Sequence, residues 1–212
     1  MSQKSRVPKH VKMEAIFAPV VDHFDLPEAD GLNRQLIAAI DAWRQQEPGI
    51  VPSNRSGWHS DGNIFKRSEA PFQELCRHFL TAARVPFERY FDKVTLSKKT
   101  LRLEGWVNVN MQNAYNKMHT HPRFDLSGVY FVKVPPRSSE ESGILQFLNP
   151  NYRGGDYSEL WGKLNPPAIS YPPVEGKMVI FPSSLSHWVT PNEEEAERIS
   201  IAFNVRLDEK DK

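Results

Sequence analysis

The stretch LEGWVNVNMQ, residues 103–112, alternates between two kinds of side chain. Successive side chains of an extended strand point to opposite faces, so Trp106, Asn108 and Asn110 share one face while Val107 and Val109 share the other. We therefore expect a β-strand here, with an apolar side that packs and an amide-bearing side that can face a polar space.

The rest of the chain extends this pattern in both directions. Upstream, residues 29–46 and 68–91 carry apolar side chains at helical spacing, with Asp30 as a plausible N-cap and Pro86 as a break or bend. Downstream, short β-rich runs are separated by turn-rich segments, and they are LSGVYFVKV (126–134), GILQFL (143–148), KMVIFP (177–182) and RISIAFNVRL (198–207). The strands follow one another without helices between them, which predicts an antiparallel sandwich or jelly roll. With the two helical segments upstream, we expect a mainly β protein with flanking helices.

Composition limits the classes of function. The 212 residues are 39% hydrophobic and 25% charged, with a net charge of +1, so we expect no nucleic-acid partner and no membrane partner. We expect one domain over residues 1–212, comprising a helical buttress with entrance segments (1–100), a jelly-roll core (101–207) and a frayed tail (208–212). The single cysteine, Cys76, lies in an apolar pattern as a structural thiol and fits a reducing cytoplasm. Homodimer formation is left open.

Two histidines one residue apart, in MHTHPRF (118–124), raise the question of a metal. Residues at i and i+2 of a strand point the same way, so His119 and His121 would present both imidazoles to one space. Imidazole is a good ligand for iron, zinc or copper, but a pair needs a third group. His187 follows the apolar run MVIF near a strand end and is the best candidate. Surface histidines without a metal are the alternative interpretation.

Arg198 and Ser200 share one face of the strand predicted at 198–207. An arginine aimed inward is costly unless its charge is matched. A ligand carboxylate would match it, with the Ser200 hydroxyl adding a hydrogen bond. A protein carboxylate in a structural ion pair is the alternative.

In this order, these motifs resemble the Fe(II)- and 2-oxoglutarate-dependent oxygenases, and more narrowly a small branch from bacteria and phages. The resemblance rests on WVNVN, HTHPRFDLSGVYFVKVP, GILQFLNP, GKMVIFPSSLSHWVTPN and RISIAFNVRL, with GWHSDGNIF (57–65) as a weaker echo. It implies a double-stranded β-helix with helices against one sheet. It also implies Fe(II) held by His119, His121 and His187, and 2-oxoglutarate held by Arg198 and Ser200. With O2, a C–H bond of a small molecule such as an amino acid or metabolite would be hydroxylated, with release of succinate and CO2.

One position departs from the family pattern. The usual site has two histidines and one carboxylate, whereas His121 occupies the place of the carboxylate. Three schemes remain open: three histidine ligands, which we prefer, replacement of one histidine by Asp125, or His119 and His187 alone with His121 hydrogen-bonded behind them.

Further polar residues are weaker candidates. Asn108 and Tyr130 could contact 2-oxoglutarate, although a satisfied amide network and a core tyrosine are the plain alternatives. Trp106, Asn110 and Asn116 could contact the substrate.

Two other functions compete with the oxygenase. A three-histidine dioxygenase that needs no cofactor would use the same metal site, but it would not need the arginine and serine pair. A non-catalytic jelly-roll binding module would keep the pocket alone, although structural metal sites are usually closed and four-coordinate.

Overall fold

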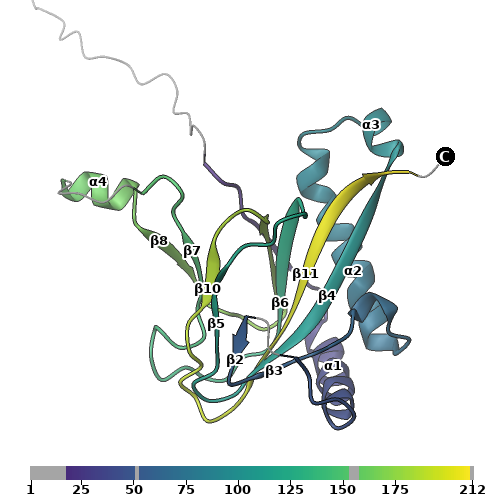
Figure 1. Cartoon of the computed structure of the whole chain (residues 1–212), viewed down its shortest axis with the longest axis vertical. Coiled ribbons are helices and arrows are strands. Elements are labelled where there is room, and N and C mark those ends of the chain that lie inside the picture. Colours follow the sequence, from purple (N-terminus) through teal and green to yellow (C-terminus); the bar gives the residue numbers. More distant parts are fainter. Residues whose placement is uncertain (1–17, 51–52, 153–157, 211–212) are drawn as a thin grey trace, which may run out of the picture.

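Two antiparallel sheets face each other in a jelly roll, and helices cover one of them (Figure 1). The computed structural model describes residues 18–50, 53–152 and 158–210. Phe131, Val179 and Phe181 of one sheet pack with Leu145 and Phe147 of the other, so a small apolar core lies between the sheets. This is the jelly roll expected from the strand pattern, and it agrees with the double-stranded β-helix that the family resemblance implies.

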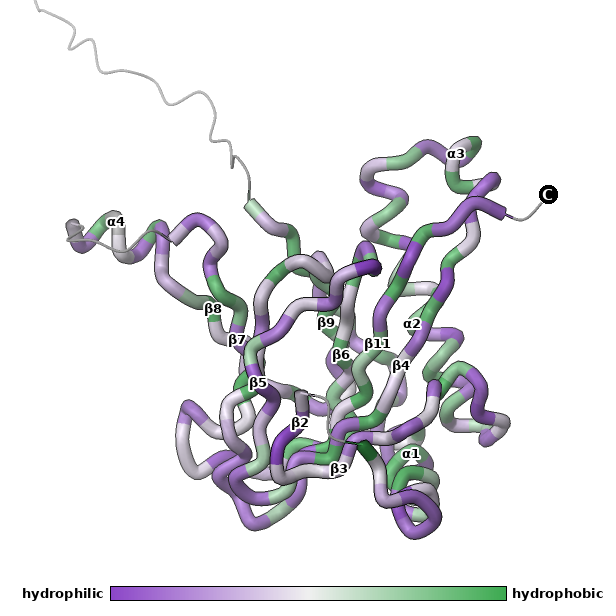
Figure 2. The backbone as a smooth tube through the Cα atoms, viewed as in Figure 1, coloured by the Kyte–Doolittle hydropathy of each residue, from purple (hydrophilic) through white to green (hydrophobic). Residues whose placement is uncertain are grey.

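The larger sheet has the strand order β1-β9-β6-β11-β4-β3. Its strands are β1 (Asp22–Asp25), β9 (Lys177–Pro182), β6 (Leu126–Lys133), β11 (Arg198–Glu209), β4 (Lys99–Asn110) and β3 (Trp58–His59). Strands β4 and β11 pair along their whole length, from Arg198 opposite Asn110 to Glu209 opposite Lys99. Figure 2 shows hydrophobic and hydrophilic positions alternating along these two strands. Their long ladder fixes which side chains of β11 face the inside of the jelly roll.

The smaller sheet has the strand order β2-β5-β10-β7-β8. Its strands are β2 (Asn54–Arg55), β5 (Tyr115–His119), β10 (His187–Val189), β7 (Leu145–Leu148) and β8 (Ala168–Tyr171). Strand β10 pairs with β5 on one side and with β7 on the other, so His187 lies in the middle of this sheet.

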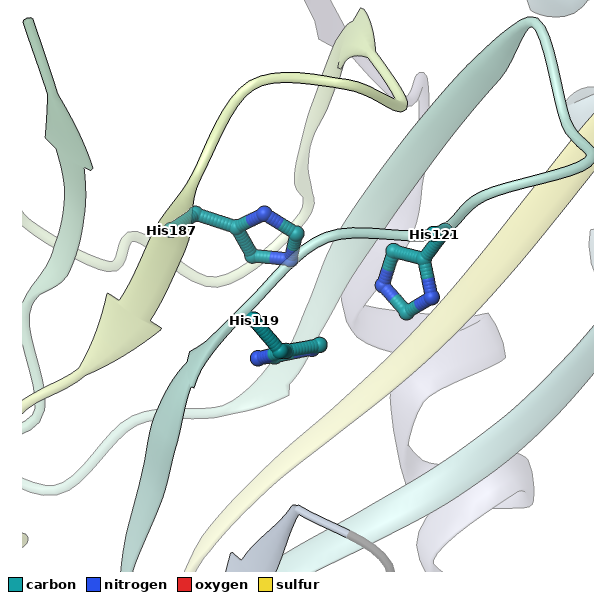
Figure 3. Close-up of side chains that lie close together, drawn as sticks. All are labelled: His119, His121 and His187. Carbon is teal, nitrogen blue, oxygen red and sulfur yellow. The ribbon is translucent and has the colours of Figure 1, made fainter.

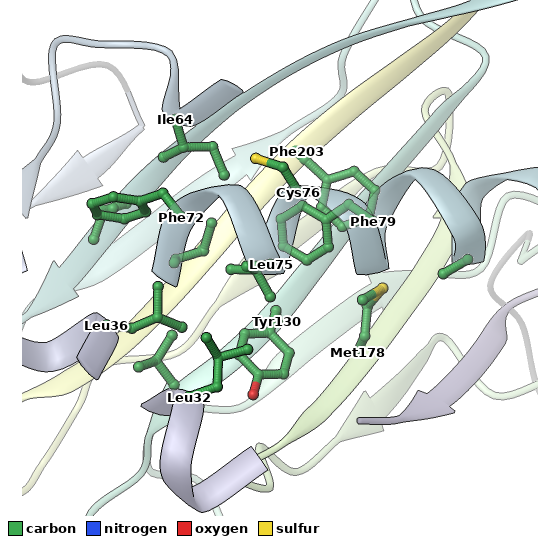
Figure 4. Packing of buried hydrophobic residues seen from close by; sticks show 14 of the residues in the cluster. Leu32, Leu36, Ile64, Phe72, Leu75, Cys76, Phe79, Tyr130, Met178 and Phe203 are labelled. Carbon is green, nitrogen blue, oxygen red and sulfur yellow. The ribbon is translucent and has the colours of Figure 1, made fainter. Parts of the chain in front are cut away.

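Helices pack on the outer face of the larger sheet. They are α1 (Ala29–Arg44) and α2 (Ala70–Glu88), accompanied by the single 3-10 turn η1 (Ile64–Lys66), while α3 (Lys93–Ser97) and α4 (Glu159–Leu164) are short. Figure 4 shows Leu36 of α1 and Phe72, Leu75 and Phe79 of α2 packed over the sheet. Phe79 stacks on Phe203 of β11 with ring centroids 4.1 Å apart. Burial of this layer is the main apolar contribution to stability.

Several local expectations need correction. Helix α1 begins at Ala29 with Glu28 as its N-cap residue, so Asp30 lies inside the first turn. Helix α2 continues through Pro86 to Glu88. Strand β11 continues to Glu209, so the first two residues of the expected frayed tail are ordered by pairing with β4. Residues 211 and 212 of that tail lie outside the described residues.

The N-terminal half also contributes strands. β1, β2 and β3 add to the edges of the two sheets, so residues 1–100 do more than supply the helices expected there. Within the described residues, no helix is both long enough and apolar enough to cross a membrane.

Candidate functional site

Three histidine rings gather at the inner side of the smaller sheet (Figure 3). His119 ends β5, His187 begins β10, and His121 stands in the segment that leaves β5. One ring nitrogen of each histidine lies within 4.8 Å of those of the other two. Three converging imidazoles on this spacing form a donor set that suits a divalent transition metal.

The backbone aligns two of the rings. His119 Nδ1 lies 2.6 Å from the carbonyl oxygen of Lys117, and His187 Nδ1 lies 2.8 Å from that of Leu185. A carbonyl can only accept, so both Nδ1 atoms donate and the Nε2 lone pairs are left free. Such a hydrogen bond on the far nitrogen is the usual way in which proteins orient a metal-binding histidine.

His121 has a side-chain partner in place of a carbonyl. Its Nδ1 lies 3.4 Å from Asn204 Nδ2 of β11, and its backbone N–H donates to the carbonyl of Ser183. When the amide nitrogen of Asn204 faces Nδ1, that nitrogen accepts and the proton of neutral His121 sits on Nε2. When the amide is turned by half a turn, its oxygen faces Nδ1, Nδ1–H donates, and Nε2 is free for a metal. The Asn204 amide therefore decides whether His121 can be the third ligand.

Burial keeps these histidines neutral. Burial, followed by the charge of His119, lowers the pKa of His187 to about 4. Burial, followed by the charges of His187 and His119, lowers the pKa of His121 to about 3. Burial also lowers the pKa of His119. Neutral imidazoles at neutral pH are ready to bind a metal without first losing a proton.

Arg198 lies behind the histidines on β11, and among the described residues its charge has no partner. The side chain is fully buried, and its Nη1 donates to Ser200 Oγ at 3.2 Å. Its Nε and Nη2 atoms have no hydrogen-bond partner among the described residues. Burial lowers the pKa of Arg198 to about 10, so the guanidinium stays charged at neutral pH.

This arrangement gives no support to a structural ion pair as the explanation of the inward arginine. An uncompensated buried charge costs about 3–5 kcal/mol, and no carboxylate among the described residues lies within ion-pair distance of Arg198. The two free donors point to a ligand carboxylate, which binds a guanidinium through paired hydrogen bonds.

The neighbours of Arg198 leave room for its side chain. Its guanidinium carbon lies 5.3 Å from the ring centroid of Phe131. Gly143 has a φ of +65°, and a Cβ there would lie 3.0 Å from Arg198 Cδ. The glycine thus serves both a left-handed backbone turn and the packing of the arginine stem.

One small cavity connects the histidines with the arginine. Its volume is about 50 Å³, room for several water-sized groups. The expected residues that line it are Trp106, Asn108, Asn116, His119, His121, His187, Arg198 and Ser200. The structure therefore brings eight of the residues singled out in the sequence to one space, with metal donors at one end and a carboxylate-binding group at the other.

Amide side chains form part of the wall. Asn54 Nδ2 lies 3.5 Å from Asn108 Oδ1, and Asn110 Nδ2 donates to Asn116 Oδ1 at 3.3 Å. Asn110 sits behind Asn116 and does not line the cavity. The expected contact of Asn110 with a substrate is therefore not supported, because Asn116 stands between them.

Tyr130 and Asp125 lie elsewhere. The Tyr130 hydroxyl donates to Asn33 Oδ1 of α1 at 2.7 Å, in the layer between sheet and helices (Figure 4), so its expected contact with 2-oxoglutarate is wrong. Asp125 Oδ2 accepts from the backbone N–H of Leu207 at 2.8 Å, and Asp125 is not in the histidine group. In this structure Asp125 therefore lies apart from the three histidines, with its carboxylate bound to the β11 backbone.

Neither Asn204 nor Glu104 received a role from the sequence. Asn204 shares the inward face of β11 with Arg198 and Ser200, and Glu104 shares that of β4 with Trp106. The same alternation that located the arginine could have located both. Cys76, in contrast, is a buried thiol whose pKa burial raises to about 12, as the structural interpretation requires.

The comparisons with known proteins agree with this geometry. The model of the family described as "Putative 2OG-Fe(II) oxygenase" matches residues 104–204. No curated protein sequence matches the chain.

Solved structures share the fold at low sequence identity. A prolyl-4-hydroxylase from Pseudomonas putida is similar with a TM-score of 0.61 and 17% identity, over 88% of this chain and 91% of that one. HygX from Streptomyces hygroscopicus, with nickel and 2-oxoglutarate bound, has a TM-score of 0.56 and 13% identity, over 88% and 82% of the two chains. The alpha-ketoglutarate-dependent carbocyclase SnoK from nogalamycin biosynthesis has a TM-score of 0.60 and 14% identity, over 89% and 79%. At these identities the likeness concerns the fold.

Proposed function

We propose that this chain is a non-haem dioxygenase of the 2OG-Fe(II) oxygenase family, whose model matches residues 104–204, and that it hydroxylates an unactivated C–H bond of a small molecule. Fe(II), 2-oxoglutarate and O2 are the metal, cosubstrate and oxidant of this family. When bound, the iron and 2-oxoglutarate supply the oxidising chemistry, and the cosubstrate leaves as succinate and CO2. The residues of the chain then have to bind, orient and shield these groups.

The observation that carries the proposal is the pairing of a three-histidine cluster with an unmatched arginine in one cavity. The residues present fit both groups. His119 and His187 each keep an Nε2 lone pair free, and His121 gains one when Asn204 turns its oxygen toward Nδ1. We assign the three histidines to the metal.

Arg198 and Ser200 are assigned to the distal carboxylate of 2-oxoglutarate. The free Nε and Nη2 donors of Arg198 can hold both carboxylate oxygens, while Ser200 Oγ fixes the guanidinium through Nη1. Asn108 lies opposite Ser200 across the β4 and β11 ladder and lines the same cavity, so its amide can add a hydrogen bond.

Apolar side chains limit water at this end of the cavity. Phe131, Leu145 and Phe181 belong to the buried core between the sheets, beside the arginine and His187. Low polarity strengthens the interaction of the guanidinium with a carboxylate. Trp106 also lines the cavity, with its ring centroid 5.6 Å from that of His121, and we place the substrate beside it.

The unmatched arginine also separates this function from the alternatives. A dioxygenase that needs no cofactor would have no use for a buried cation behind its metal, and a binding module would not need three neutral imidazoles on one space.

The test is succinate formation by the protein loaded with Fe(II) in air, with 2-oxoglutarate and without an added substrate. We expect slow formation of succinate that stops when iron is removed. A protein that holds iron yet forms no succinate would contradict the proposal.

A further inference from the structure

The inward face of β4 continues past Trp106 to Glu104, next to the histidine cluster. Glu104 lies directly opposite Asn204 in the ladder with β11. Asn204 Nδ2 lies 3.4 Å from Glu104 Oε1 and also 3.4 Å from His121 Nδ1. Asn204 Oδ1 lies 2.8 Å from Ser127 Oγ, a hydroxyl that can pair with either end of the amide. One amide group therefore separates the Glu104 carboxylate from a ring of the metal cluster.

The charge of Glu104 is not matched within the part of the chain that the structure describes. No cation among the described residues forms an ion pair with it. The two arginines further out on this face are both occupied by Asp208: Arg206 Nε donates to it at 2.6 Å, and Arg102 Nε lies 3.4 Å from it. The side chain of Glu104 is exposed, so its carboxylate faces solvent at the rim of the site.

An aromatic ring stands beside this carboxylate. Trp106 shares the face of Glu104, lines the cavity and lies with its ring centroid 5.6 Å from that of His121. His59 of β3 stacks on Trp106 at 5.7 Å with an angle of 19° between the rings, which fixes the indole. An indole next to a free carboxylate is a typical arrangement for binding an ammonium or guanidinium group, through cation–π attraction and a charged hydrogen bond.

We infer that the substrate carries a protonated amine or guanidinium, which the Glu104 carboxylate binds while the indole of Trp106 packs along its stem. The inference rests on the proposed function and names the substrate class of that site. When Glu104 holds the cation, a C–H bond a few atoms further along the substrate lies toward the histidine cluster.

Binding to the protein loaded with Zn(II) and 2-oxoglutarate tests this class directly, because zinc holds the site without turnover. The probes are L-lysine and L-arginine, against L-norleucine and L-citrulline, which keep the shape and lose the side-chain charge. Each probe is also offered with N-acetyl and C-amide caps, which distinguishes a free amino acid from a residue in a peptide. Calorimetry measures the affinities for the wild type, Glu104→Gln and Glu74→Gln.

We expect at least one cationic probe to bind 10-fold or more tightly than its neutral partner. Glu104→Gln should remove that preference, and Glu74→Gln, an exposed glutamate on α2, should keep it. Equal affinities within each pair, a preference that persists in Glu104→Gln, or no binding of any cationic probe would overturn the inference. Failure of the zinc-loaded protein to bind 2-oxoglutarate would instead count against the proposed function.

Discussion

His187 lies directly opposite His119 in the antiparallel ladder between β10 and β5. Directly paired residues of neighbouring strands hold their side chains on the same face, about 5 Å apart at Cβ. The two rings have centroids 4.4 Å apart, and each donates Nδ1–H to a backbone carbonyl two residues before it in its own chain segment. The smaller sheet therefore positions two of the three histidines without the help of a metal.

Replacing either paired histidine should abolish tight metal binding. In His119→Ala or His187→Ala, one of three neutral donors is lost, and we expect the affinity for Fe(II) or Co(II) to fall on the order of 100-fold or more, beyond the 10 to 100-fold typical of losing an outer hydrogen bond. Metal titration of the metal-free protein measures this.

Asp125→Ala is the matched control, because the carboxylate of Asp125 accepts from the Leu207 backbone. It should leave metal affinity within twofold of the wild type. A large loss in Asp125→Ala would restore Asp125 as a ligand, and an unchanged affinity in His187→Ala would contradict the three-histidine cluster.

Gly143→Ala should weaken 2-oxoglutarate binding without weakening metal binding. The added Cβ would lie 3.0 Å from Arg198 Cδ, and the residue would keep a φ of +65° that alanine adopts poorly. The arginine stem must shift, so we expect about a 10-fold rise in the dissociation constant of 2-oxoglutarate. Calorimetry on the zinc-loaded variant measures it, and unchanged affinity would show that the position of the arginine is not set by Gly143.

The variant Tyr130→Phe tests whether Tyr130 is a core residue or a residue of the site. The Tyr130 hydroxyl donates to Asn33 of α1, so loss of this hydrogen bond should lower the free energy of unfolding by about 1–2 kcal/mol. The affinity for 2-oxoglutarate should stay unchanged, because the ring faces the helices. Urea unfolding and 2-oxoglutarate titration check the two parts, and a loss of affinity in a stable variant would contradict this placement.

Much of the site could be predicted from the sequence because β4 and β11 show a clear period of two. That period placed Arg198 and Ser200 on one face of β11, and Trp106 and Asn108 on one face of β4. The ladder then pairs Ser200 with Asn108 and Ala202 with Trp106. The histidine spacing likewise predicted a shared space for His119 and His121.

Strand β6 shows why Tyr130 was misplaced. Tyr130 and Val132 pack under the helices while Phe131 packs between the sheets, so both faces of β6 are buried. A strand with two buried faces has apolar residues at nearly every position, and the alternation that tells inside from outside disappears. The position of Asp125 also depends on a contact with Leu207, far along the chain, which no local pattern reveals.

The metal-free protein should lose stability as the pH falls below about 6.5. Burial lowers the pKa of His187 to about 4, while the unfolded chain titrates near the usual value of 6.5. The unfolded state then binds more protons, so the free energy of unfolding is highest above pH 6.5 and falls toward pH 4. We expect His187 to account for about 1 kcal/mol between pH 7.5 and 5.5.

Urea unfolding of metal-free wild type and His187→Gln at both pH values measures this contribution. The variant should show the smaller loss between pH 7.5 and 5.5. Identical losses in the two proteins would mean that His187 is not held neutral by burial.

We propose that one cavity holds Fe(II) at the histidines and 2-oxoglutarate against Arg198. The most direct test of this proposal is the visible absorption spectrum of the anaerobic protein with Fe(II), titrated with 2-oxoglutarate, for the wild type and Arg198→Gln. We predict a weak charge-transfer band in the wild type that saturates with 2-oxoglutarate, and a variant that binds iron equally but needs on the order of 100-fold more 2-oxoglutarate, the loss of a charged pair of about 3 kcal/mol. No band in the iron-loaded wild type, or a variant that saturates at the same concentration, would contradict it.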